Sequence, residues 1–368
     1  MAISLYSRTL AVTTFTAVCL ISAVATAQTP GQVRIDGRVI SPDGKPAPVT
    51  SSTGPLFEPR EEMRKLIQEI SAFARRYRRD FTVVTQNGLA LLTKSDSGDE
   101  TQALPARTYM RSIDGVLQEA LFYGLPEMDK PTTKNRRDAL LTLAGVAKQG
   151  GLMVLALDYA KTTEAIDAAY ELGRAKGLVS FVAPAVGLEI NAVPRHPHHP
   201  ASANSTSIIS LRSIKNFLYI RDSSAFGRQD EFAMKLHDNN FDAVVVDIFH
   251  RKGEPLSTQA VETLKFKKLG ARRLVLAYLN IGAAESYQSY WKSHWREGSP
   301  LWISAAYPGN ADKYFVQYWH PEWRKIITGN TDSYVYGIVK QGFDGVVLDD
   351  VDAYRYFEGG MDAVEVVR

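Results

Sequence analysis

Residues 341–354 read QGFDGVVLDDVDAY, and this stretch gives the first indication of the fold. An apolar run, Val346 to Leu348, lies between glycine-containing turns and ends in three carboxylates, Asp349, Asp350 and Asp352. Such a run is typical of a buried strand in an α/β sheet, so the acids fall just beyond the carboxyl end of the strand. Parallel α/β folds bind their ligands at that edge. An aspartate there can also cap the next helix, but three acids in four positions exceed what a cap needs.

Short apolar strands alternate with helical segments through most of the chain. Residues 61–78 carry apolar side chains at helical spacing, and a second helix is predicted from Thr162 or Thr163 to Lys176, ending at Gly177. This alternation indicates right-handed βαβ units and a parallel sheet. We predict eight principal strands, at residues 81–88, 113–119, 152–159, 217–220, 243–249, 274–281, 314–319 and 345–349.

Eight strands are the number of a (β/α)₈ barrel of the TIM type, which is the predicted fold class. The run LVSFVA at residues 178–183 would then be an extra strand or a rim piece. A doubly wound sheet is the competing architecture. No G-x-G-x-x-G turn follows any predicted strand, which disfavours a dinucleotide-binding role.

The N-terminal segment is predicted to direct export. Residues 1–27 combine a charged Arg8, an apolar run from Leu10 to Val24 and a small-residue cleavage site at residues 25–27, as in a secretory signal peptide. The protein would therefore be periplasmic or secreted. The one cysteine, Cys19, lies inside this signal, so the mature chain has no thiol for disulfides, nucleophilic catalysis or zinc binding.

The remaining chain divides into barrel units and two connecting segments. Residues 28–60 are expected to form a tether with a β-hairpin, and residues 193–210 a linker rich in Pro, His and Ser. The barrel units are predicted at 61–192 and 211–368. The net charge of +3 is small and the basic residues are dispersed, so we expect no nucleic-acid partner. The apolar run from Leu10 to Val24 is too short and too rich in Thr for a membrane span, so we expect no stable membrane insertion, and we expect a monomer.

Polar side chains at the strand ends indicate the chemistry. If the strands form a barrel, an acidic and aromatic set converges on one mouth, and paired carboxylates are what glycoside hydrolysis requires. Five tryptophans within residues 291–323 could stack on sugars, or they could simply pack in the core. The aspartate cluster could also hold Mg²⁺ or Ca²⁺. The sequence contains no P-loop, G-x-S-x-G or H-E-x-x-H motif.

Several stretches together resemble one known family. They are FTVVTQNG, IDGVLQEALFYG, VLALDY, FDAVVVDI, AYLNIGAAESYQSYW, YFVQYWHPEW and GFDGVVLDDVDAY, and they span most of residues 61–357. These motifs are similar to those of the secreted endo-α-1,4-polygalactosaminidases, a glycoside hydrolase family whose bacterial members were once labelled cysteinyl-tRNA synthetase-related. The resemblance implies a (β/α)₈ barrel that cleaves partly deacetylated α-1,4-linked galactosamine polymers of biofilm matrix. An acidic mouth suits the cationic amino groups of that polysaccharide.

The resemblance also implies roles for individual residues. Asp349 and Glu119 match the acidic pair of the family, so they are the predicted catalytic residues. The remaining candidates are predicted to bind substrate: Asp247, Glu285, Asp352, Asp350, Asn87, Tyr278, Tyr159, Asp158 and Trp319. No cofactor and no metal ion are expected.

The chain departs from the family in two respects. Ala283 occupies the position after a glycine where bacterial relatives usually carry a Glu, although Glu285 is kept. The order of the motifs also differs, because the unit near Phe217 usually comes first and the Asp349 strand usually leads into the helix at 61–78. We therefore expect a circular permutation, which is tolerable because chain ends in compact domains often lie close together.

Two other classes of function stay open at this point. A barrel that binds polysaccharide without cleaving it is one alternative, motivated by Ala283. A hydrolase of another glycan, or a metal-dependent enzyme that uses the aspartate cluster, is the second.

Overall fold

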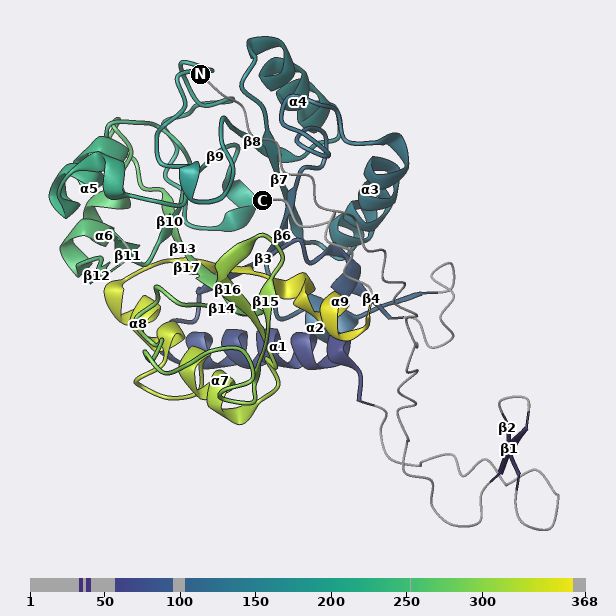
Figure 1. Ribbon diagram of the computed structural model, residues 1–368. Helices are drawn as coiled ribbons and strands as arrows, with labels where there is room; N and C mark the ends of the chain where they lie inside the picture. The colour runs from purple at the N-terminus through teal and green to yellow at the C-terminus, as the bar shows by residue number, and fades with distance from the viewer. Residues whose placement is uncertain (1–32, 36–37, 41–56, 95–102, 252, 360–368) are drawn as a thin grey trace, which may run out of the picture. The chain divides into compact units, whose positions relative to one another are not determined.

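The barrel sheet contains eight parallel strands that follow one another in sequence order around it (Figure 1). The computed structural model describes residues 57–94, 103–251 and 253–359, together with strands at 33–35 and 38–40. The barrel strands are β3 (Thr82–Gln86), β6 (Gly115–Glu119), β7 (Met153–Tyr159), β8 (Val179–Ala183), β9 (Phe217–Ile220), β10 (Ala243–Asp247), β13 (Leu274–Asn280) and β17 (Gly345–Asp349). Since β17 pairs with both β13 and β3, the last strand joins the first. The predicted (β/α)₈ fold is confirmed.

One junction of the barrel lacks a ladder of backbone hydrogen bonds. Within the described residues, β8 and β9 are the two edges of the hydrogen-bonded sheet. The two strands are nevertheless adjacent, because the rings of Phe181 and Phe217 lie with centroids 5.6 Å apart. The predicted linker, residues 193–210, connects these strands.

Two of the strand predictions are exchanged in the structure. Residues 178–183 are a full barrel strand, β8, whereas the stretch predicted at 314–319 overlaps β16 (Asn310–Val316), which lies outside the barrel sheet. β16 pairs antiparallel with β14 (Ala283–Glu285) and β15 (Ile303–Tyr307). A parallel strand needs a crossover, usually a helix, and residues 281–309 contain no α-helix. Burial agrees, since every residue of β8 is buried while β16 begins with exposed residues.

Helices surround the strands in Figure 1. They are α1 (Pro59–Tyr77), α2 (Arg107–Met110), α3 (Lys134–Gln149), α4 (Thr163–Ala175), α5 (Gln229–His237), α6 (Thr258–Leu264), α7 (Pro321–Ile327), α8 (Tyr334–Gln341) and α9 (Tyr354–Phe357). The helix predicted at 61–78 is α1, which buries Met63, Leu66 and Ile70 against the sheet. The second predicted helix is α4, which ends where Gly177 adopts a φ of 61°.

The linker at 193–210 is held against the barrel by a buried ion pair. Lys267 Nζ lies 2.5 Å from Asp242 Oδ1, and neither side chain is exposed. Lys267 also donates to the carbonyl oxygens of Asn204 and Thr206. Breaking a fully buried pair is costly, so these contacts fix the path of the linker.

The N-terminal segment forms a separate unit, residues Met1–Leu56. Its strands β1 (Val33–Ile35) and β2 (Arg38–Ile40) pair antiparallel, as the predicted hairpin requires. The predicted signal peptide at 1–27 and the PDG triplet at 42–44 lie outside the described residues. No helix in the described part of the chain is both long and apolar enough to span a bilayer.

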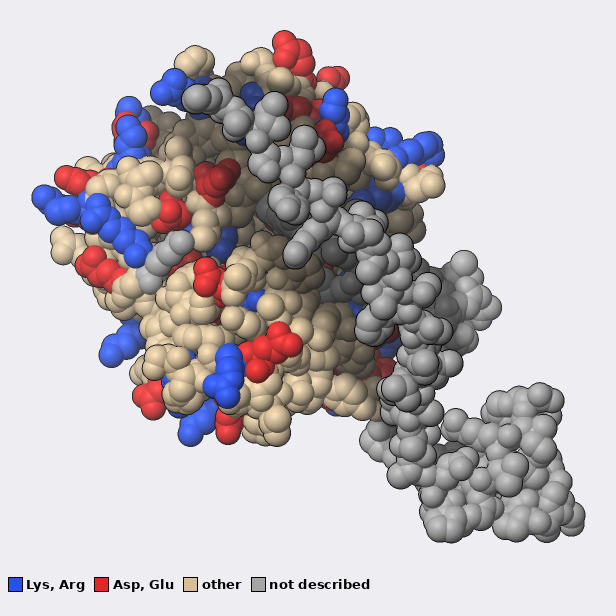
Figure 2. Space-filling view, viewed as in Figure 1, with Lys and Arg blue, Asp and Glu red and all other residues tan. Residues whose placement is uncertain are grey.

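The remaining short strands form two antiparallel pairs outside the barrel. β4 (Thr93–Lys94) pairs with β5 (Leu104–Pro105), and β11 (Phe249–His250) pairs with β12 (Glu254–Pro255). On the face seen in Figure 2, Lys and Arg side chains are interspersed with Asp and Glu.

Candidate active site

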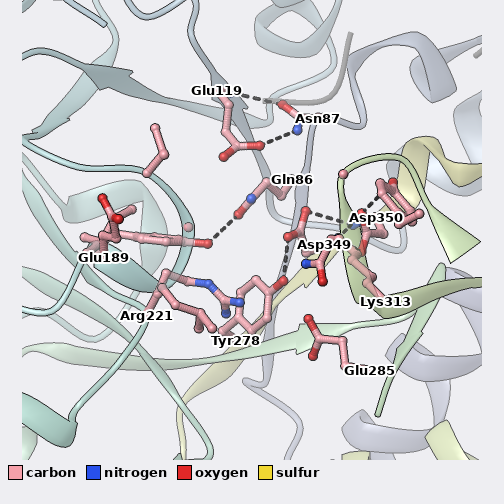
Figure 3. A pocket seen from close by; sticks show the side chains of 18 of the residues that line it. Gln86, Asn87, Glu119, Glu189, Arg221, Tyr278, Glu285, Lys313, Asp349 and Asp350 are labelled. Carbon is pink, nitrogen blue, oxygen red and sulfur yellow. Dashed lines mark hydrogen bonds and ion pairs between the residues drawn. The ribbon is translucent and has the colours of Figure 1, made fainter. Parts of the chain in front are cut away.

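The carboxyl ends of the barrel strands surround a cavity of about 380 Å³ (Figure 3). Two further segments complete its wall, namely residues 186–190 after β8 and residues 307–310 between β15 and β16. Eight of the predicted site residues line it: Asn87, Glu119, Tyr159, Tyr278, Glu285, Asp349, Asp350 and Asp352. The barrel thus gathers residues that are far apart in the sequence.

Glu119 ends β6 and is held by neutral donors. Its carboxylate accepts hydrogen bonds from the Tyr159 hydroxyl and from Asn87 Nδ2, the latter at 2.5 Å. Asn87 is placed for this by a φ of 57°, a conformation that asparagine tolerates better than most residues. Burial and the nearby charge of Asp349 raise the pKa of Glu119 to about 7.

Asp349 ends β17 and has a different environment. The Tyr278 hydroxyl donates to its Oδ2 at 2.6 Å, and the backbone N–H of Asp350 donates to its Oδ1 at 2.8 Å. Burial and the charge of Asp350 raise its pKa, whereas Lys313, the Tyr278 hydrogen bond and Arg221 oppose that rise. The charge of Asp349 is one cause of the raised pKa of Glu119, so the two groups do not titrate independently.

Asp350 is enclosed by donors from the strands around it. Its carboxylate accepts hydrogen bonds from Asn280 Nδ2, from the Tyr307 hydroxyl at 3.0 Å and from Lys313 Nζ at 2.9 Å. The side chain is only 8% exposed. Gly282 permits this packing, because a Cβ there would lie 1.9 Å from the Asp350 carbonyl oxygen. The contacts suit an anchoring role better than direct contact with a substrate.

The other predicted acids lie at the cavity or close to it. Burial and the charges of Asp350 and Asp349 raise the pKa of Asp352 to about 7. Glu285 lines the cavity and accepts from Gln288 Nε2 at 3.2 Å. Asp247 does not line it, but its Oδ2 lies 4.0 Å from Nη1 of Arg221, which does. Burial raises the pKa of Asp247 to about 6.

Two predicted substrate-binding residues are placed elsewhere. Asp158 is fully buried and accepts from the backbone N–H groups of Phe122 and Tyr123 at 2.7 and 2.9 Å. Side chains alternate along a strand, so the neighbouring Tyr159 faces the cavity and Asp158 faces away. Trp319 packs against Phe57 and Phe357, with ring centroids 4.7 Å apart in each case. Neither residue lines the cavity, which corrects their predicted placement.

The cavity also contains residues that the sequence did not predict, among them Arg221, Lys313 and Tyr307. Arg221 follows β9 directly, and its guanidinium lies over the Tyr278 ring. Its position after an apolar strand could have identified it, as for the acids. Tyr307 lies in β15 and Lys313 in β16. The sequence that follows Lys313 was predicted to be a barrel strand, and no element was predicted around Tyr307. Among the described residues, no group of three or more His, Cys, Asp or Glu side chains is arranged to hold a metal ion.

The fold and the cavity define a (β/α)₈ barrel with a carboxylate-lined site. Residues 222–365 match the model of the glycoside-hydrolase family GH114. That segment contains β10, β13 and β17, and therefore Asp349, but not Glu119. The match thus supports the resemblance to a glycoside hydrolase family over the C-terminal part of the barrel.

Three curated relatives are similar over a comparable length. An uncharacterised protein of Methanocaldococcus jannaschii is 35% identical over 166 residues, which cover 43% of this chain and 46% of the relative. One of Deinococcus radiodurans is 39% identical over 123 residues, covering 33% and 36%, respectively. One of Thermotoga maritima is 30% identical over 155 residues, covering 41% and 45%. The matched regions span less than half the length of each relative.

Proposed function

We propose that this protein is a glycoside hydrolase that uses Glu119 and Asp349 as its catalytic carboxylates. The observation that carries this proposal is the placement of two acids on the wall of one cavity, one held by neutral donors and the other close to cations. Glycoside hydrolysis needs one carboxyl group that is protonated and one that is ionised. The match of residues 222–365 to a glycoside-hydrolase family supports the same reaction class.

The surroundings of Glu119 and Asp349 indicate which carboxyl group donates a proton and which reacts as the anion. Glu119, with a pKa of about 7, can remain protonated near neutral pH and donate its proton to the glycosidic oxygen of the leaving sugar. Lys313 and Arg221 oppose the rise in the pKa of Asp349, so we assign the role of the anion to Asp349. It would either attack the anomeric carbon, giving a glycosyl ester that water then hydrolyses, or take a proton from an attacking water. The separation of the carboxyl groups in a substrate complex distinguishes these routes, since about 5 Å suits the first and about 6.5–9.5 Å the second.

The substrate proposed is a partly deacetylated, α-1,4-linked galactosamine polymer, cut internally by a periplasmic or secreted enzyme. Acids outnumber cations on the cavity wall: Glu119, Glu189, Glu285, Asp349, Asp350 and Asp352 face Arg221 and Lys313. An excess of carboxylates attracts the protonated amino groups of such a polymer. The resemblance of the motifs to polygalactosaminidases supports the same substrate class.

A panel of glycans tests this function. The purified protein is incubated with partly deacetylated poly-galactosamine, with the fully acetylated polymer and with chitosan, and new reducing ends are counted. Cleavage that prefers the first polymer supports the proposal. Binding without new reducing ends would instead support a non-catalytic barrel. Preferential cleavage of another glycan would replace the substrate proposal, and activity lost with a chelator would indicate a metal-dependent enzyme.

We also propose that the chain is a circular permutant of the family arrangement. Arg60, at the start of α1, pairs with Glu358 at 3.1 Å and lies over the Tyr354 ring, so α1 and α9 are neighbours. Among the described strands, β8 and β9 are neighbours without a hydrogen-bond ladder, and this is where the family's first and last strands would meet. A family match that is confined to residues 222–365 is what one continuous piece of a permuted chain would give.

A rearranged chain tests the permutation. Residues 359 and 57 are joined by a short flexible link, and the chain is opened within the linker at 193–210. This variant should fold into the same barrel, with a helical signal and thermal transition close to those of the parent. A control opened within α4 should fail to fold. If both variants misfold, or both fold equally well, the barrel tolerates a break in the linker no better than a break within α4. The permutation proposal would then lose its support.

A further inference from the structure

The antiparallel insert formed by β14, β15 and β16 brings a cation to the candidate catalytic strand. The insert leaves the barrel just after β13 and pairs Glu285 with Lys313 across β14 and β16. Lys313 points into the cavity beside Asp349 and Asp350 in Figure 3. Its side chain is only 15% exposed, so it is a built part of the site and not a solvated surface lysine.

Lys313 and Tyr307 of the insert converge on one carboxylate. Lys313 Nζ lies 2.9 Å from Oδ1 and 2.7 Å from Oδ2 of Asp350, and the Tyr307 hydroxyl donates to the same Oδ1 at 3.0 Å. The ammonium group also lies 4.3 Å from the centroid of the Tyr307 ring. Hydrogen bonds to charged partners are stronger than neutral ones, so these contacts fasten the insert to the end of β17.

Adjacent carboxylates at the end of β17 create an electrostatic problem. Asp349 and Asp350 are consecutive, and burial together with the charge of Asp350 disfavours ionisation of Asp349. Asp350 cannot reach solvent, because Asn280, Tyr307 and Lys313 enclose it. A nearby cation is the simplest way to keep both groups charged.

We propose that Lys313 is a positioning residue that neutralises Asp350 and thereby holds Asp349 as an anion ready for reaction. This inference rests on the proposed hydrolase function and goes beyond it, because it assigns a role to the insert. The insert would then be required for the reactivity of Asp349 as well as for the shape of the cavity. Lys313 would not itself need to touch the sugar.

Several other groups also act on Asp349 from the surrounding strands. Arg221 of the β9 end stabilises its anion, and Tyr278 of β13 donates a hydrogen bond to it. Glu119 of β6 and Asp352 of the β17 turn repel it, since each is itself affected by the charge of Asp349. The surrounding tyrosines, Tyr159, Tyr219 and Tyr307, have pKa values raised well above their usual range and are neutral at working pH. Glu285 faces Lys313 from β14.

Charge variants isolate the contribution of Lys313. The acid limb of the pH profile of kcat/KM is measured for Lys313→Met, Asp350→Asn and the double variant. The single lysine change should move the limb to higher pH, because a stabilising cation is lost and Asp350 is left unpaired. Asp350→Asn should move it to lower pH, because a repelling anion is lost. The double variant should lie between the two, and Lys313→Arg should restore the limb.

A matched control and a second readout make the outcome decisive. Lys292→Met removes an exposed lysine that does not line the cavity, and it should leave the limb unchanged. Circular dichroism and thermal unfolding check that each variant folds. Titration of the Asp349 carboxyl by ¹³C NMR, assigned with Asp349→Asn, needs no activity and should show the same directions.

The outcomes separate this inference from the hydrolase proposal. If no glycan is cleaved but the Asp349 titration moves as expected, the electrostatic role of Lys313 stands and the hydrolase proposal fails. If the wild type is active but neither the limb nor the titration moves in folded Lys313→Met, the role of Lys313 is overturned. A double variant that behaves like Lys313→Met alone would also overturn it.

Discussion

The two sides of the cavity present similar carboxylates in contrasting surroundings. On one side, Glu119 is held by the neutral groups of Asn87 and Tyr159. On the other, Asp349 accepts a hydrogen bond from Tyr278, and the cations Lys313 and Arg221 favour its ionised form. The surroundings, more than the residue type, therefore separate a proton donor from an anion in one site. Single substitutions can change one side of the cavity and leave the other intact.

Removing either carboxylate should have the largest effect. Glu119→Gln and Asp349→Asn should each lower kcat/KM by on the order of 10²–10⁴-fold, since one removes the proton donor and the other the anion. Initial rates on partly deacetylated poly-galactosamine measure this. Glu171→Gln on the exposed face of α4 serves as the control and should retain activity. Near-normal activity in either cavity variant would reject the role assigned to that residue.

Removing the tyrosine hydroxyl on each side should have a smaller effect, and each change should shift a different limb of the pH profile. Tyr278→Phe deletes the donor to Asp349, so its pKa rises and the acid limb of kcat/KM moves to higher pH. Tyr159→Phe deletes the donor to Glu119, so its pKa rises and the basic limb moves to higher pH. Each should also cost on the order of 10-fold at the optimum, as expected for losing a hydrogen bond to a charged group.

The two tyrosine variants control for each other, because they remove the same group from opposite walls. If both moved the same limb, or if neither moved any limb, the two sides would not titrate as distinct acids. The contrast drawn between them would then be wrong.

The smallest expected effect is on the free energy of unfolding. It comes from removing Asp352, one of the acids on the Asp349 side of the cavity. The pKa of Asp352 rises from its ordinary value of 3.8 to about 7 in the folded protein. Its protonated form therefore favours folding below about pH 4, and this contribution is lost as the pH rises through 7. Asp352→Asn should stabilise the protein at pH 8 by on the order of 1–3 kcal/mol, and by less at pH 5.

Urea unfolding at the two pH values measures that difference. Glu171→Gln again provides the control, because it removes an exposed carboxylate that does not line the cavity. A stabilisation that is equal at both pH values would show that burial and the neighbouring charges do not raise the pKa of Asp352.

The sequence predicted the barrel because buried parallel strands are apolar runs that alternate with helices. It also placed Glu119, Asp349 and their tyrosine donors at one mouth, because the carboxyl ends of parallel strands converge. Residues 314–319 were predicted as a principal barrel strand in place of residues 178–183, because both stretches are short and apolar. Only the chain path shows that β16 returns antiparallel.

The remaining errors have physical causes of the same kind. Asp158 and Tyr159 end one strand, and side-chain alternation allows only one of them to face the cavity. The roles of Lys313 and Tyr307 could not be predicted, because they depend on how the insert folds back onto Asp350. A contact between distant segments leaves no local pattern in the sequence.

The pH dependence of kcat/KM for the wild type shows whether Glu119 acts as the proton donor and Asp349 as the anion. A bell-shaped profile is predicted, with a basic limb near pH 7 that reports mainly the proton on Glu119 and an acid limb that reports the anion of Asp349. Loss of the basic limb in residual Glu119→Gln activity would complete the assignment. A kcat/KM on partly deacetylated poly-galactosamine that stays level or keeps rising from pH 6 to pH 9 would contradict these two roles.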